Sequence, residues 1–221
     1  MTDVIDTADF AVMRHAMVAS QLRTSGVNDP RVIEAMASVP REDFVPAEWR
    51  SLAYRDTGVP LPGGRRTNIP LATGRLLTEA GLAPSDRVLL IGAAGGYGAA
   101  VLARLVASVV AVEVDPTLAA AAREALAGEA NVTVVEAPLE AGAPEHAPYD
   151  VLVIDGAVEA IPDTLVAQVA PNGRAVAGMI DRGVTRLASG RRTAGGFRMV
   201  DFADVESAIL PGFARPRSFT F

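Results

Sequence analysis

Apolar runs of strand length alternate with helical segments through the middle of this 221-residue chain. Uninterrupted apolar runs predict strands that are buried on both faces, and their alternation with helices predicts a parallel sheet covered on both sides. The predicted strands are RVLLIG, SVVAVEV, NVTVVEA, YDVLVIDGA and GRAVAGMI. The predicted helices around them are TGRLLTEAGL, YGAAVLARLV, PTLAAAAREALAG and IPDTLVAQVAPNG, the last of which ends at Gly173.

Both flanks of this alternating region have a different pattern. Residues 8–24 place apolar side chains at helical spacing up to Gly26, and Asp29 with Pro30 predicts the start of a second helix. After residue 182 the alternation stops, and antiparallel strands joined by glycine-rich turns are predicted in TRLASG, RRTAGGFRMVDFADV and ESAILPGF. We therefore expect one domain of three parts: helices and an irregular loop (1–73), an α/β core (74–181) and antiparallel strands (182–221).

Composition and charge exclude several classes of function. The chain has no cysteine and only two histidines, so thiolate chemistry and a histidine-rich metal centre are excluded. Its net charge of −6 does not favour a nucleic-acid partner. The apolar runs are too short to cross a membrane, and the N-terminus lacks the features of a secretory signal. We expect a cytoplasmic protein without a membrane partner, and nothing in the sequence specifies an oligomeric state.

A glycine-rich turn follows the first predicted strand, and an acid ends the second. In open parallel sheets, ligands bind beyond the carboxyl ends of the strands, where glycines let backbone amides approach closely. Glu113 lies about twenty residues after the turn, at a position where acids bind ribose hydroxyls, although a solvated acid is the alternative. The turn lacks G-x-G-x-x-G spacing, which favours an adenosyl cofactor over a dinucleotide. The candidate cofactor-binding residues of the turn are Gly92, Ala93, Ala94, Gly95 and Gly96.

Four segments together resemble one enzyme family over roughly residues 13–212. They are MVASQLRTSGVNDPRVIEAMASVPREDFVPAEWRSLAY, RVLLIGAAGGYGAAVLA, APYDVLVIDGAVEAIP and LVAQVAPNGRAVAGM, and they resemble protein-L-isoaspartate O-methyltransferases. The resemblance implies a Rossmann-like class I methyltransferase fold with a doubly wound, mostly parallel seven-stranded sheet and N-terminal helices over the cofactor side. It further implies methyl transfer from S-adenosylmethionine to the α-carboxylate of isoaspartyl residues, with isoaspartyl proteins or peptides as partners.

The loop before the glycine turn departs from the family pattern. The resemblance implies a catalytic serine in the motif G-Q-T-I-S-Q-P, whereas this chain has G-R-R-T-N-I-P. Thr67 matches the threonine, and the serine position falls on Ile69 or, with one residue deleted, nearest to Asn68. Thr67 and Asn68 are therefore the candidate catalytic residues, as hydrogen-bond donors to the substrate carboxylate, and ordinary loop roles are the alternative. Arg65 and Arg66 can attract that carboxylate or form a solvated pair.

Further departures fall on the implied cofactor site. The resemblance implies an acid before the glycine turn, where this chain has Leu90, and a glycine where it has Ala94. It implies G-D-G after the third strand, the acid of which accepts a hydrogen bond from adenine. This chain has A-P-L there, with Leu139 as its third residue and the acids Glu136 and Glu140 on either side, for which a solvated role is favoured.

Asp155 is an additional acid at the end of the fourth predicted strand. It joins the candidate cofactor-binding residues, with repulsion of the substrate carboxylate, binding of a cationic group or capping of the next turn as its possible roles. His146 is predicted at the opposite end of the sheet, away from the chemistry.

Three functional hypotheses follow from these departures. The chain is an isoaspartyl methyltransferase, a non-catalytic relative that acts as a binding module, or a methyltransferase for a different acceptor that uses Asp155 and Asn68.

Overall fold

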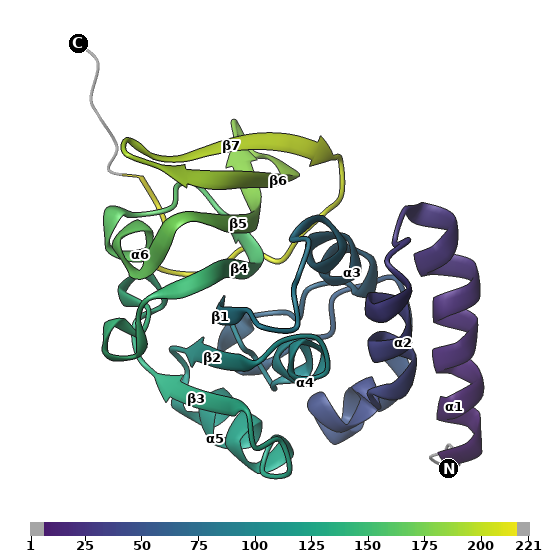
Figure 1. Ribbon diagram of the computed structural model, residues 1–221. Helices are drawn as coiled ribbons and strands as arrows, with labels where there is room; N and C mark the ends of the chain where they lie inside the picture. Colours follow the sequence, from purple (N-terminus) through teal and green to yellow (C-terminus); the bar gives the residue numbers. More distant parts are fainter. Residues whose placement is uncertain (1–6, 216–221) are drawn as a thin grey trace.

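The computed structural model describes residues 7–215, which form a seven-stranded sheet with helices on both faces (Figure 1). Strands β1 to β5 are parallel, and β6 and β7 continue the sheet as an antiparallel hairpin. The strand order is β3-β2-β1-β4-β5-β6-β7, which confirms the predicted doubly wound fold. The strands are β1 (Arg87–Ile91), β2 (Ser108–Glu113), β3 (Val132–Glu136), β4 (Tyr149–Val158), β5 (Val169–Asp181), β6 (Val184–Thr193) and β7 (Gly196–Ala203).

Helices and short helical turns connect these strands and precede them. The α-helices are α1 (Thr7–Ala16), α2 (Pro30–Ser38), α3 (Pro70–Glu79), α4 (Tyr97–Ala103), α5 (Pro116–Ala125) and α6 (Asp163–Gln168). The short turns are η1 (Met17–Leu22), η2 (Arg23–Ser25), η3 (Arg41–Phe44), η4 (Ala47–Leu52), η5 (Pro62–Gly64), η6 (Leu139–Ala141) and η7 (Pro144–His146). None of the helices in the described part of the chain is long and apolar enough to cross a bilayer.

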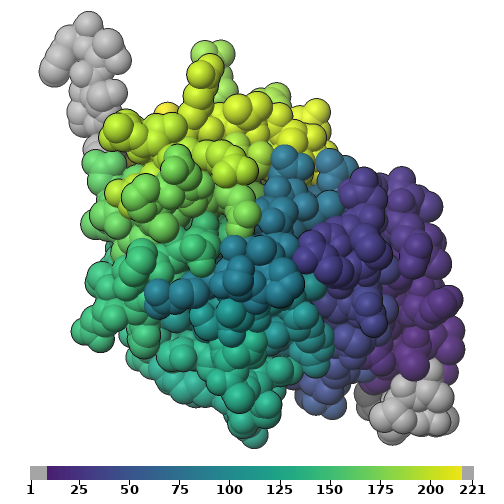
Figure 2. All heavy atoms as spheres, viewed as in Figure 1, coloured from purple at the N-terminus to yellow at the C-terminus, as the bar shows by residue number. Residues whose placement is uncertain are grey.

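The sheet separates two hydrophobic clusters, and the four residues of β1 that follow the exposed Arg87 are all apolar because they face both clusters. Val88 and Leu90 point into the cluster beneath α3 and α4, whereas Leu89 and Ile91 point into the cluster on the opposite face. A strand buried on both sides has no position left for a polar side chain. The N-terminal helices extend the first cluster, and in the space-filling view they form one flank of the molecule, coloured purple (Figure 2).

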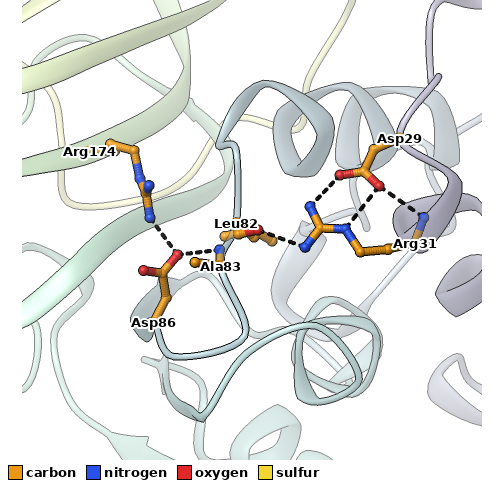
Figure 3. A network of polar contacts seen from close by, with 6 residues as sticks. All are labelled: Asp29, Arg31, Leu82, Ala83, Asp86 and Arg174. Atoms are coloured by element: carbon orange, nitrogen blue, oxygen red, sulfur yellow. Dashed lines mark hydrogen bonds and ion pairs between the residues drawn. The ribbon is translucent and has the colours of Figure 1, made fainter.

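The predicted start of the second helix is confirmed by its cap. The Asp29 carboxylate accepts a hydrogen bond from the backbone N–H of Arg31 at 2.9 Å, with Pro30 at the first helical position. The Arg31 guanidinium also pairs with Asp29 and donates to the Leu82 carbonyl at 2.9 Å (Figure 3). This cap therefore ties α2 to the loop that precedes β1.

A second network fixes the amino edge of the sheet. The Asp86 carboxylate accepts a hydrogen bond from the backbone N–H of Ala83 at 2.7 Å and forms an ion pair with Arg174 of β5 (Figure 3). Its backbone carbonyl accepts from the N–H groups of Ala107 and Ser108 at the start of β2. Asp86 thus joins the beginnings of β1 and β2 to Arg174 in β5. His146 also lies at this amino edge, in η7 just before β4, as predicted.

Two predicted elements are wrong. The helix predicted to reach Gly173 stops at Gln168, and β5 begins at Val169 with a register shift near Asn172, whose φ is 63°. Pro171 and the left-handed Asn172 are incompatible with a continuous helix. The ESAILPGF segment forms only an isolated bridge between Ala157 and Ile209 instead of a strand. It crosses the carboxyl edge of the sheet because its apolar side chains pack into the second cluster, Leu210 among them.

Candidate active site at the carboxyl edge of the sheet

The candidate site lies where the chain direction through the sheet reverses, between β1 and β4. β2 and β3 lie on one side of β1, and the chain then crosses to the other side of β1, where β4 and β5 follow. Connections on the two sides of this point leave the sheet on opposite faces, and the resulting crevice at the carboxyl ends is where open α/β sheets bind ligands.

The glycine-rich turn after β1 has the backbone conformation that its sequence predicts. Gly92, Ala94 and Gly96 have φ values of 85°, 48° and 102°, all left-handed. A methyl group on Gly95 would collide with the carbonyl oxygen of Phe44, which belongs to η3. The N-terminal segment therefore lies directly over the turn, and Ala94 carries its methyl group in a conformation that favours glycine.

Glu113 ends β2 beside this turn and is completely buried. Its carboxylate accepts hydrogen bonds from the backbone N–H of Ala94 at 2.7 Å and from those of Val114 and Asp115 at 2.9 Å each. It also forms an ion pair with the guanidinium of Arg65. The predicted juxtaposition of glycine turn and acid is present, and the loop residue Arg65 holds the carboxylate from the solvent side.

Thr67 is buried within the loop that precedes α3. Its hydroxyl oxygen accepts hydrogen bonds from the backbone N–H of Val59 at 3.0 Å and from the guanidinium of Arg41 at 3.2 Å. Both bonds use the oxygen as an acceptor, so its proton remains available to a further acceptor.

Asn68 connects three separate parts of the chain. Its side-chain NH₂ donates to the Asp155 carboxylate at 2.9 Å, and its side-chain oxygen accepts from the Ala208 backbone N–H at 3.2 Å. Its backbone carbonyl accepts from Arg41 at 2.7 Å. The structure thus assembles the predicted residues Asn68 and Asp155, and these bonds fix the loop in place.

Asp155 lies within the second half of β4, where the pairing with β5 shifts register, and it is partly shielded from solvent. One carboxylate oxygen, Oδ1, accepts hydrogen bonds from Asn68 and from the Thr73 hydroxyl at 2.8 Å. Burial raises the pKa of Asp155, while the bonds from Asn68 and Thr73 and the charge of Arg41 act in the opposite direction. Asp155 therefore contacts α3 and the loop before it, residues 65–69, hereafter the substrate loop, rather than capping the turn that follows it.

Arg41 and Tyr97 complete the site and were not among the predicted residues. The Arg41 guanidinium stacks over the Tyr97 ring, with 4.5 Å between its central carbon and the ring centroid. No carboxylate of the described residues lies within 4.0 Å of its nitrogens, and neither its Nε nor the Tyr97 hydroxyl has a hydrogen-bond partner there. Burial lowers the pKa of Arg41 and raises that of Tyr97 to about 12. The signal for Arg41 was its place in VPREDFVP, within the segment that carries the family resemblance.

The positions implied for adenine recognition are largely apolar. Leu139 is buried in the second hydrophobic cluster, and the backbone N–H of Ala137 donates to the Glu113 carbonyl at 3.1 Å. Glu136 pairs with Arg123 at 3.5 Å, and both side chains are almost half exposed. Glu136 therefore has the predicted solvated role, and Leu139 contributes an apolar surface rather than a polar contact.

Comparisons with known proteins agree with this geometry. Residues 13–205 match the family model described as protein-L-isoaspartate(D-aspartate) O-methyltransferase. A protein-L-isoaspartate O-methyltransferase of Roseiflexus castenholzii is 39% identical over 92% of this chain and 94% of its own length. Another, from Koribacter versatilis, is 40% identical over 77% of this chain and 78% of its own length. The chain belongs to the protein-L-isoaspartate O-methyltransferase family.

A solved structure shares the fold of this methyltransferase. The Plasmodium falciparum protein, described as a protein-L-isoaspartate O-methyltransferase in complex with S-adenosyl-L-homocysteine, has a TM-score of 0.75 and 18% identity. The match covers 88% of this chain and 96% of the other. At this identity the likeness supports the fold alone.

The residues of this methyltransferase fit an adenosyl cofactor at the glycine turn and at Glu113, the buried acceptor beside it. The site is closed as it stands, because the space between the turn and the substrate loop is about 20 Å³, enough for one water molecule. Two side chains close it: Arg65 covers Glu113, and Leu210 packs on Gly92. Arg65 belongs to an irregular loop that can move without disturbing the sheet. The Leu210 segment, by contrast, is hydrogen-bonded to Ala157 of β4 and packs into the second cluster.

Proposed function

We propose that this chain transfers a methyl group from S-adenosylmethionine to the α-carboxylate of L-isoaspartyl residues in proteins. The observation that carries the proposal is the Glu113 carboxylate, which is fixed at the end of β2 and bonded to the N–H of Ala94 in the glycine turn. This is where a ribose is bound in nucleoside-binding α/β proteins. The acceptor is proposed from the names of relatives that match nearly the whole chain.

The chemistry asks the protein mainly to position the reactants. When bound, S-adenosylmethionine supplies a methyl group on a positively charged sulfur; a carboxylate oxygen displaces that sulfur, which keeps the electron pair of the broken carbon–sulfur bond. A carboxylate is ionised at neutral pH, so no general base is needed. In both of its hydrogen bonds the Thr67 hydroxyl oxygen is the acceptor, so its O–H can donate a hydrogen bond to the second oxygen of the substrate carboxylate.

A groove beside the site provides a path for a peptide. It has a volume of about 970 Å³ and adjoins the closed space at Arg65, Arg66 and Leu210, which line both. Arginines at this boundary favour an anionic group. An isoaspartyl residue that enters along the groove would therefore present its carboxylate toward Thr67.

Methyl transfer to matched peptides tests this function. The full chain is incubated with methyl-labelled S-adenosylmethionine and either an isoaspartyl peptide or the same peptide with ordinary aspartate. We expect base-labile methyl ester on the isoaspartyl peptide alone. No ester above background on either peptide, with an active family member as positive control, would overturn the proposal.

A second candidate function rests on the closed state of the site. The Arg65–Glu113 ion pair and the bonds of Asn68 occupy groups that a substrate complex would use, as expected for a non-catalytic family member that acts as a binding module. Calorimetric titration separates the two functions. Micromolar binding of S-adenosylmethionine favours the enzyme, and no binding at millimolar concentration favours the module. Binding without isoaspartyl methylation would indicate a different acceptor.

A further inference from the structure

Leu90 of β1 and Asp155 of β4 converge on one glycine of α4. β1 and β4 are adjacent and parallel, and Leu90 is paired with Val153. Asp155 lies two residues beyond Val153, so its side chain projects from the same face of the sheet as Leu90. A Cβ on Gly98 would lie 3.0 Å from Oδ2 of Asp155 and 3.6 Å from a terminal methyl of Leu90. The Asp155 carboxylate therefore fills the space next to position 90.

The two oxygens of Asp155 have different surroundings. Oδ1 accepts two hydrogen bonds, one from Asn68 and one from Thr73. Oδ2 accepts none from the described residues and faces Gly98, in the first turn of α4, at the wall of the closed space. A partly buried carboxylate with one oxygen free is a strong acceptor for an ammonium group.

We infer that Asp155 is a positioning residue with two roles. Among the described residues that line the closed space, it supplies the carboxylate, and it does so from β4. Through Oδ1 it holds the substrate loop at Asn68. Through Oδ2 it receives the positively charged amino-acid end of the cofactor. This inference rests on the proposed function, because it assigns a ligand to the same site.

The pairing of an apolar residue on β1 with an acid on β4 has a physical reason. Two carboxylates in the confined space beside Gly98 would repel one another, and one would be protonated or displaced. Leu90 and Asp155 therefore form a coupled pair, in which either position can carry the acid but both together are unfavourable. The Arg41 charge lies close enough to influence Asp155, and Arg65 and Arg66 line the same closed space, so the Asp155 carboxylate already faces several guanidinium groups before any ligand enters.

Two ligands that differ at the amino-acid end test the assignment. S-adenosylhomocysteine carries the α-ammonium group, whereas 5′-methylthioadenosine lacks the whole amino-acid portion. In calorimetric titrations we expect Asp155→Asn to weaken S-adenosylhomocysteine binding about tenfold or more, as for loss of a charge-assisted hydrogen bond. Binding of methylthioadenosine should change by less than about twofold, a separation that a merely structural role would not produce.

A variant that moves the acid from β4 to β1 provides the rescue. Asp155→Thr should weaken S-adenosylhomocysteine binding, Leu90→Glu should weaken folding, and Leu90→Glu/Asp155→Thr should recover most of the binding. The matched control is Asp150→Asn, at the amino end of the same strand, where the carboxylate accepts from the Arg87 backbone N–H at 2.8 Å. Asp150→Asn should bind both ligands with the same affinity as the unmodified chain. Thermal unfolding of each variant confirms that the protein titrated is folded.

The outcomes separate this inference from the proposed function. Unmodified protein that binds neither ligand overturns both. If the unmodified protein and Asp155→Asn bind S-adenosylhomocysteine equally well, the role of Asp155 is overturned and the proposed function is not. Equal weakening of both ligands by Asp155→Asn also overturns this inference, since that result would assign Asp155 a purely structural role.

Discussion

The two ends of the sheet carry charged networks of similar composition and different construction. At the amino edge, Asp86 pairs with Arg174, and both groups belong to or adjoin regular strands (Figure 3). At the carboxyl edge, Glu113 pairs with Arg65, which comes from the irregular loop before α3. The Arg174 side chain is 25% exposed, whereas Glu113 is completely buried and Arg65 is only 12% exposed.

This difference separates a structural network from one suited to ligand exchange. The Asp86 network joins strand beginnings that sheet hydrogen bonds already hold together. The Glu113 pair joins a strand end to a loop, so opening it moves Arg65 while the three backbone bonds to Glu113 persist. A buried acid with a removable partner is the arrangement that a competing ligand needs.

The largest expected effect is that of Glu113→Ala. It leaves the N–H groups of Ala94, Val114 and Asp115 and the Arg65 guanidinium without their acceptor. Removal of one partner of a buried ion pair costs about 3–5 kcal/mol of stability. Urea denaturation measures this loss, and a change of less than about 1 kcal/mol would contradict the burial argument.

The matched substitution at the amino edge is Asp86→Ala, with a smaller expected effect. The Asp86 carboxylate has fewer partners than that of Glu113, and Arg174 can turn to solvent when Asp86 is removed. We expect a loss of about 1–2 kcal/mol, the usual range for partly exposed charged hydrogen bonds. Cofactor binding, measured on the folded protein, should not change. A larger loss than for Glu113→Ala would reverse the comparison between the edges.

The fold was predictable from the sequence where burial alone determines the pattern. β1, β2 and β4 lie inside the sheet and contain apolar runs, so their strands followed from hydrophobicity. β3 was predicted from its valines, although it is an edge strand without a fully buried residue. α6 was overestimated because its apolar periodicity continues into β5 through Pro171 and Asn172. The segment around Leu210 has strand-like residues, yet its packing on Gly92 depends on tertiary contacts that no local pattern encodes.

The candidate site was predictable only in part, for a related reason. Glu113 was found because a strand-end acid near a glycine turn is a local signal, and its distance from the turn along the chain is short. The partner of Glu113 is 48 residues away, and that of Asn68 is 87 residues away at Asp155. Over such separations, the conformation of the loops determines which arginine pairs with which acid. Arg41 was missed because its place in VPREDFVP indicates family membership and does not indicate that its guanidinium stacks on the Tyr97 ring.

A smaller effect is expected for Arg65→Ala. Without the Arg65 guanidinium, Glu113 is free to receive a ribose, and the ligand no longer has to displace an ion pair. We expect S-adenosylmethionine to bind roughly five- to tenfold more tightly, about 1 kcal/mol, because the ligand no longer displaces Arg65 while the three backbone bonds to Glu113 remain. Arg66→Ala is the control, because Arg66 donates to the Gly58 carbonyl and not to Glu113. Calorimetry that shows weaker binding for Arg65→Ala would mean that Arg65 contacts the ligand.

The smallest effect concerns pH, where Asp155 at the carboxyl edge and Asp29 at the N-cap of α2 are expected to act in opposite directions. Burial raises the folded-state pKa of Asp155 above the ordinary value of about 3.9, so its ionised form destabilises the fold at neutral pH, and this penalty disappears as pH falls through the raised value. Hydrogen bonding to Arg31 lowers the pKa of Asp29, so the stability that the ionised Asp29 contributes is present above about pH 4 and is lost as pH falls through the lowered value.

The unmodified protein, compared with Asp155→Asn, should therefore gain stability as pH falls from neutral to about 4. Compared with Asp29→Asn, it should lose stability below about pH 4. Denaturation of the three proteins across this range measures both slopes, and slopes of equal sign would show that burial does not dominate at Asp155.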